Sequence, residues 1–189
     1  MNKPVIPQSD FSESTLSSKA VYGGGLLHVR EAQVRLPDGS EARREYIEHP
    51  GAVIIIAELD DGHLVMERQY RYALKTHLIE LPAGKIEPGE DMLLTAQREL
   101  LEETGYSART WQHLYTLHPC VGYSNERMEF FLAGGLTPGA AKLDDGEFLD
   151  VFILSLADGL ALVDAGEITD IKTVTGLLWL ERHRRVASK

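Results

Sequence analysis

The sequence predicts an α+β fold in which helices cover a mixed β-sheet, with a small β extension in front of it. Three observations support this. Ala52–Ala57 is a continuous run rich in β-branched residues, strand-like segments lie on both sides of it, and the segments 91–104 and 169–186 favour long helices. Since strands and helices are interspersed, we expect a layered domain with a single core, which 189 residues that are 43% hydrophobic can bury.

The segment before Ala52 predicts a β-hairpin. Leu26–Leu36 and Glu41–Ile47 favour strands, and the Pro-Asp-Gly sequence between them is typical of a tight turn. The first residues are polar and rich in serine, which indicates little regular structure. The predicted organisation is a flexible lead-in over 1–20, a β extension over 21–50 and the main domain over 51–189.

The main domain should alternate between strands and helices. Gly105 follows the first helix as a C-terminal cap, and Thr169 is the expected N-cap of the last. The expected strands are 52–57, 64–70, 111–117, 128–132 and 149–155, and the expected helices are 91–104, 156–165 and 169–186.

Charge and cysteine content narrow the possible partners and compartment. The formal net charge of -10 gives no general attraction for a nucleic acid or an anionic membrane. Cys120 is the single cysteine, which excludes an intramolecular disulfide and fits a reducing compartment. Without a signal-like or membrane-spanning apolar segment in the sequence, we expect a cytoplasmic protein.

Three carboxylates lie on one stripe of the helix expected at 91–104. Glu99, Glu102 and Glu103 have i, i+3, i+4 spacing, at which like charges repel one another. Arg98 can pair with Glu102, and Mg²⁺ or Mn²⁺ would satisfy the others because hard cations prefer clustered carboxylate oxygens. The alternative is an ordinary solvated acidic helix face.

The surrounding spacing resembles the signature of the Nudix hydrolases. Gly84 is followed after five residues by Glu90 and after seven more by Arg-Glu-Leu-Leu-Glu-Glu-Thr-Gly at 98–105. Only Tyr106 departs from the pattern, where a bulky aliphatic residue is usual. The resemblance implies an α/β/α sandwich and the hydrolysis, with Mg²⁺ or Mn²⁺, of a nucleoside diphosphate linked to another moiety.

The resemblance also implies roles for the matching residues. Glu99 and Glu103 would be the main metal ligands, with Glu102 close by and the Ala83 carbonyl as a further ligand. Arg98 would orient a glutamate, and Gly84 and Glu90 would support the junction between loop and helix. The bound cations would neutralise the diphosphate and lower the pKa of an attacking water.

A second acidic cluster at 142–147 offers a mobile carboxylate. Related enzymes place a catalytic base or an extra metal ligand on the corresponding loop. Glu147 is the first candidate and Asp145 the second, while the alternative is a solvated acidic turn.

Segments outside the signature resemble the ADP-ribose pyrophosphatase branch. They are 43–45, 49–53, 68–71, 80–84, 119–126 and 168–170. This resemblance implies cleavage of ADP-ribose to AMP and ribose 5-phosphate by a homodimer whose N-terminal β segments pair. Arg71 would contact a phosphate, Arg44 would reach the nucleotide from the partner subunit, Glu80 would bind the terminal ribose, and Glu126 is a further substrate-binding candidate. The alternatives are surface arginines and, for Glu80, a salt bridge at a strand end.

Three rival functions stay open at this stage. A hydrolase of GDP-mannose or ADP-glucose would use the same signature. A non-catalytic Nudix ligand sensor would be expected to have a damaged signature or an attached nucleic-acid-binding domain. Removal of oxidised nucleoside triphosphates fits the long β extension poorly.

Overall fold

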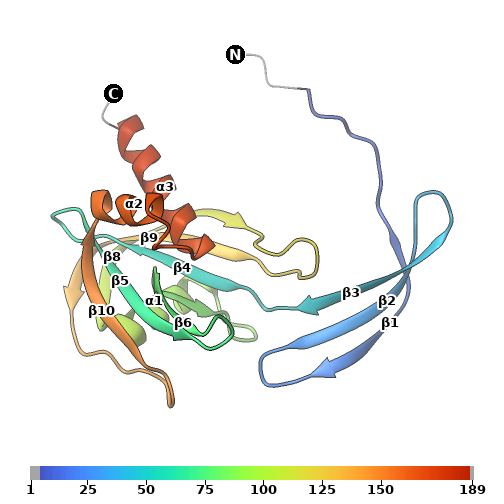
Figure 1. Cartoon of the computed structure of the whole chain (residues 1–189), viewed down its shortest axis with the longest axis horizontal. Helices are drawn as coiled ribbons and strands as arrows, with labels where there is room; N and C mark the ends of the chain where they lie inside the picture. The colour runs from blue at the N-terminus through green and yellow to red at the C-terminus, as the bar shows by residue number, and fades with distance from the viewer. Residues whose placement is uncertain (1–4, 188–189) are drawn as a thin grey trace. The chain divides into compact units, whose positions relative to one another are not determined.

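The computed structural model describes residues 5–187 and divides the chain into two compact units. Among the described residues, the smaller unit comprises those up to His49 together with Cys120–Glu126. The larger unit comprises the other described residues from Pro50 onward. Figure 1 shows the elements of each unit.

The smaller unit contains a three-stranded antiparallel sheet in the order β1-β2-β3. The expected hairpin is confirmed. In its turn, the Asp38 carboxylate accepts a hydrogen bond of 2.9 Å from the Ser40 N–H, and Gly39 has a φ of 87°, a conformation that favours glycine. The strands are β1 (Ser14–Gly23), β2 (His28–Arg35) and β3 (Glu41–Glu48).

Strand β1 corrects the expectation of a flexible lead-in over 1–20. Residues 14–20 lie within this strand and pair with β2, whose backbone supplies their hydrogen bonds. Their exposure on both faces explains why the sequence lacks a strand-like hydrophobic pattern there. The expectation for residues 1–4 lies outside the described residues.

Two sheets form the centre of the larger unit. One has four strands in the order β7-β4-β9-β8, with β4 parallel to β9 and the other pairs antiparallel. The other is antiparallel, in the order β10-β5-β6. The strands are β4 (Ala52–Ala57), β5 (His63–Arg71), β6 (Thr76–Glu80), β7 (Ala83–Lys85), β8 (Tyr106–Leu117), β9 (Met128–Pro138) and β10 (Leu149–Ser155).

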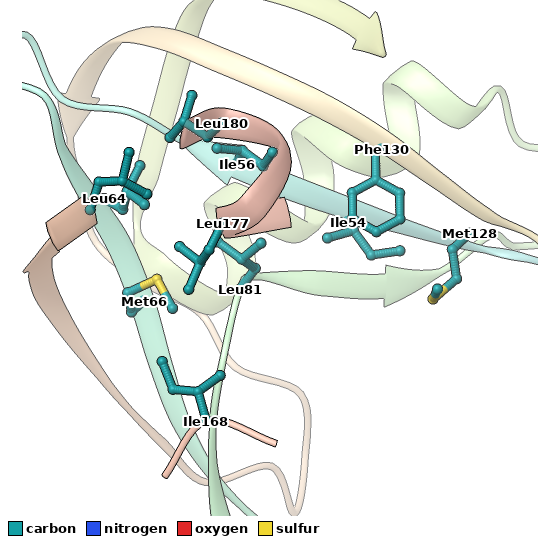
Figure 2. Packing of buried hydrophobic residues seen from close by; sticks show 11 residues of the cluster. Ile54, Ile56, Leu64, Met66, Leu81, Met128, Phe130, Ile168, Leu177 and Leu180 are labelled. Carbon is teal, nitrogen blue, oxygen red and sulfur yellow. The ribbon is translucent and has the colours of Figure 1, made fainter. Parts of the chain in front are cut away.

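Helices cover the two sides, as the α/β/α prediction requires. Along β4, Val53 and Ile55 pack in one hydrophobic cluster with Leu100 of α1. The intervening Ile54 and Ile56 pack in another with residues of α2 and α3 (Figure 2). Because both faces of β4 are buried, its sequence is continuously apolar. The helices are α1 (Met92–Thr104), α2 (Leu156–Asp164) and α3 (Ile171–Ala187).

The predicted C-terminal cap of α1 is confirmed, and the N-terminal cap of α3 corrects the prediction. The Asp91 carboxylate accepts a hydrogen bond of 2.9 Å from the Leu93 N–H, and Gly105 has a φ of 75°. Before α3, the carboxylate of Asp170, and not the hydroxyl of Thr169, accepts a hydrogen bond from the Thr173 N–H. Among residues 5–187, no helix is long and apolar enough to span a membrane.

Candidate active site

Helix α1 places its glutamates against the turn that joins β6 to β7. Ala83 is the first residue of β7, and its N–H donates a hydrogen bond of 3.1 Å to Oε2 of Glu103. Gly84 lies beneath Glu99, since a Cβ at Gly84 would stand 1.9 Å from Cδ of Glu99. Glycine at this position therefore makes room for the Glu99 carboxylate.

Arg98 links three of the acidic side chains. Its Nε donates to Oε1 of Glu90 at 3.0 Å, and its Nη1 lies 2.8 Å from Glu99 and 3.0 Å from Glu102. Hydrogen bonding to Arg98 lowers the pKa of Glu90 to about 2, and its bond with Glu90 in turn raises the pKa of Arg98. Arg98 thus fixes the carboxylates along one side of α1 and ties them to Glu90 at the loop.

Two buried glutamates face each other beside this helix. Glu103 of α1 is 6% exposed and Glu67 of β5 is 3% exposed. The carboxyl group of Glu67 lies within hydrogen-bonding range of Glu103. Burial raises the pKa of both groups, and the nearby charges of Glu99 and Glu147 raise that of Glu103 further. No motif in the sequence marks Glu67; its only signal is a glutamate at the end of an apolar run.

Of the two loop candidates, the structure brings Glu147 to this group. Its Oε1 accepts a hydrogen bond of 3.3 Å from Nε2 of Gln69, on the same strand as Glu67. Its negative charge raises the pKa of Glu99, after burial has raised it more strongly. Asp145 is exposed.

Arg71 and Glu80 form a salt bridge, the alternative expected for Glu80. Nε and Nη2 of Arg71 donate to the two oxygens of Glu80 at 2.7 and 2.6 Å. Lys172 of α3 also pairs with Glu80 and lies 2.9 Å from Oδ2 of Asp170. Burial opposes ionisation of Glu80, but these cations outweigh it and lower its pKa. Lys172 and Asp170 were not assigned a site role from the sequence, because only the fold brings α3 to β6.

Two substrate-binding candidates belong to the smaller unit. Nε of Arg44 donates to Oε2 of Glu13 at 3.0 Å. The backbone N–H of Glu126 donates to Oγ of Ser124 at 3.1 Å. Their proposed contacts with substrate stay predictions.

The acidic group near α1 fits a hard divalent cation by its chemistry and burial. Oε1 of Glu67 is buried without a hydrogen-bond partner in the described part of the chain, and carboxylate oxygens are the ligands that Mg²⁺ and Mn²⁺ prefer. In the present side-chain arrangement, however, no three His, Cys, Asp or Glu residues among 5–187 form a metal-binding group. Binding would therefore require side-chain rotation within the cluster.

Comparison with family models identifies this sandwich with its acidic helix as a hydrolase that acts on pyrophosphate bonds. A family model described as the NUDIX domain matches residues 48–174, and one described as the nucleoside diphosphate sugar hydrolase N-terminal domain matches residues 13–47. The chain therefore belongs to the Nudix hydrolase family.

Curated relatives extend this similarity along most of the chain. The methanol dehydrogenase activator of Bacillus methanolicus is 36% identical, over 95% of this chain and 98% of its own length. The ADP-ribose pyrophosphatase of Bacillus subtilis (strain 168) is 36% identical, over 89% of this chain and 92% of its own. The ADP-ribose pyrophosphatase of Mycobacterium tuberculosis is 38% identical, over 92% of this chain and 84% of its own.

A solved structure supports the fold. The crystal structure of an ADP compounds hydrolase matches 96% of this chain and 98% of its own with a TM-score of 0.83. At 24% identity, it shows that the architecture is shared.

Proposed function

We propose that the protein hydrolyses ADP-ribose to AMP and ribose 5-phosphate with Mg²⁺ or Mn²⁺. The observation that carries the proposal is the group of buried carboxylates from α1 and β5, set against the Ala83 peptide. The similarity to two ADP-ribose pyrophosphatases over most of the chain supports this choice of substrate.

Glu99 and Glu103 would hold the cation, with Glu102 and the Ala83 carbonyl as further candidate ligands. When bound, a divalent cation supplies charge neutralisation to the diphosphate and acidifies water. Arg98 keeps Glu99 and Glu102 oriented through the contacts described above. Gly84 leaves space for the Glu99 carboxylate, and Glu90 anchors Arg98 from the loop.

In the reaction, water adds to one phosphorus and the bond from that phosphorus to the bridging oxygen breaks. Glu147 is the proposed base that takes the proton from water, because its loop carries it to the other carboxylates. Asp145 is the second candidate for this role. The proton returns to solvent when the products leave.

Arg71 and Glu80 are proposed to bind the phosphate and the terminal ribose. Arg71 is 43% exposed while Glu80 is 3% exposed, so the guanidinium is open to solvent although it is anchored by the carboxylate. An anchored arginine loses less conformational freedom when it binds a phosphate. Glu126 is a further candidate for binding the substrate.

The protein is proposed to act as a cytoplasmic homodimer that pairs through the smaller units, with Arg44 reaching the partner's substrate. Every residue of β1 is exposed, including Leu16, Val21 and Tyr22. An exposed edge strand that carries three large apolar side chains favours pairing with a second chain. The lone Cys120 fits a reducing compartment.

Product release from a panel of ADP-ribose, ADP-glucose and GDP-mannose tests the substrate assignment. Each compound is incubated with Mg²⁺, and phosphate is measured after treatment of the products with phosphatase. We expect ADP-ribose to be cleaved preferentially, and Glu103→Gln to abolish most of the activity. Preference for GDP-mannose would change the substrate and retain the chemistry. Binding without hydrolysis of any compound would favour a ligand sensor.

A further inference from the structure

Glu67 occupies a position where the sheet would be expected to carry an apolar residue. It follows the buried run Leu64–Met66 on β5, and Val65, two residues earlier, packs in the hydrophobic cluster beneath α1. Alternate residues of a strand share a face, so the Glu67 side chain continues the Val65 face toward α1. An apolar residue there would extend the core at no electrostatic cost.

Among the described residues, no positively charged side chain pairs with the Glu67 carboxylate. Within residues 5–187, no arginine or lysine forms an ion pair with it, and Oε1 lacks a hydrogen-bond partner. The charge of Lys172 acts on Glu67 only as a minor influence, whereas Glu80 and Glu147 repel it. A buried carboxylate in such surroundings is costly unless another cation or a proton neutralises it.

Two other carboxylates of the site approach Glu67, each from a different element. Glu103 of α1 is in hydrogen-bonding range, and Glu147 approaches from the loop before β10 through its bond to Gln69. Gln69 lies two residues after Glu67 and therefore on the same face of β5. This strand thus directs one carboxylate at Glu103 and positions another.

We propose that Glu67 is a further oxygen ligand of the divalent cation held by Glu103 in this chain. The inference rests on the proposed function, since it assumes that this cluster binds a metal. It deepens that function by making β5, as well as α1, a source of ligands. A bound cation would neutralise the Glu67 carboxylate, which no lysine or arginine pairs with among the described residues. It would thereby offset the cost of burying this charge on an apolar strand.

Direct Mn²⁺ binding tests this assignment independently of catalysis. Full-length wild-type protein and Glu67→Gln are freed of metal and titrated with Mn²⁺, and the free ion is measured by electron paramagnetic resonance. We expect the amide to weaken binding about 10- to 100-fold, the range for perturbing a metal site by one side chain. Glu67→Asp, which keeps the charge but shortens the side chain, is the second variant if the first folds poorly.

Glu129→Gln is the matched control. Glu129 is also a buried strand glutamate, at 5% exposure, but its carboxylate is satisfied by His113, Thr116 and Arg127. Its variant should bind Mn²⁺ like the wild type. Wild-type affinity in Glu67→Gln would overturn the ligand assignment alone. Lack of Mn²⁺ binding by the wild type would overturn the metal-dependent function with it.

Discussion

Glu67 and Glu80 are direct neighbours across the β5–β6 pair, but only Glu80 has cationic side chains beside its carboxylate. Both are almost fully buried, at 3% and 2% exposure. Glu80 contacts the side chains of Arg71 and Lys172, and its pKa is lowered; burial raises the pKa of Glu67, which has no such partner. Glu80 belongs to an ion-pair network formed within the chain. For Glu67, we propose that a bound cation supplies the missing positive charge.

Glu103→Gln should have the largest effect, because Glu103 shares the uncompensated environment of Glu67. Losing several kcal/mol of transition-state stabilisation corresponds to a fall in kcat/KM of about 10³-fold. Glu80→Gln should act mainly on KM, since Glu80 is proposed to bind the ribose. Steady-state kinetics with ADP-ribose and Mg²⁺ would reveal the contrast, and equal losses in kcat would remove the distinction.

Lys172→Met should weaken the ion-pair network around Glu80. It leaves Glu80 with one cation and removes the cationic partner of Asp170, so we expect a loss of about 3 kcal/mol in the free energy of unfolding. Urea denaturation measures it. In the double variant with Glu80→Gln, part of the loss should be recovered because the buried charge is gone; strictly additive losses would contradict the coupling.

Gly84→Ala should disturb the proposed metal site around Glu99 without unfolding the protein. The new Cβ would displace the Glu99 carboxylate, which can rotate away. We expect a decrease of about 10- to 100-fold in activity, as for a misplaced metal-site side chain. The thermal midpoint should change little. The matched substitution Gly39→Ala in the β2–β3 turn has open space around its Cβ but a φ of 87°, so it should reduce stability more than activity.

Glu90→Gln should have the smallest effect, mainly in acid. Hydrogen bonding to Arg98 lowers the folded-state pKa of Glu90 from 4.5 to about 2. The stability this contributes is therefore present above pH 4.5 and is lost as the pH falls toward 2. As a partly exposed pair, it should contribute about 1 kcal/mol or less. Wild type and variant should converge in stability at the acid end of a pH series; a constant difference would rule out this linkage.

Local patterns in the sequence predicted most of the fold. The apolar run of β4 and the glycine cap at the end of α1 come from residues adjacent in the chain, and these predictions are confirmed. Strand β1 was missed because its residues are exposed on both faces, so that pairing with β2 decides its structure. The short β7 is absent from the predicted strands because its Pro and Gly neighbours indicate turns.

The residues of the candidate site also fall into two groups, those that local spacing predicts and those that only the fold brings together. The signature places Glu99, Glu102 and Glu103 on one helix by spacing alone, and Arg98 with them. Glu67 and Lys172 come from elements that only tertiary packing brings to the site, so no local spacing predicts them. The salt bridge between Arg71 and Glu80 likewise depends on the β5–β6 register.

The most direct test of the account compares Glu67→Gln and Glu80→Gln by thermal unfolding at neutral pH, with and without Mg²⁺. We predict that, without metal, Glu67→Gln is about as stable as the wild type, whereas Glu80→Gln is less stable because Arg71 and Lys172 lose their shared partner. Mg²⁺ should raise the unfolding midpoint of Glu80→Gln as much as that of the wild type, and that of Glu67→Gln much less. Equal stabilisation of both variants by Mg²⁺ would contradict the claim that Glu67 is neutralised by a bound cation.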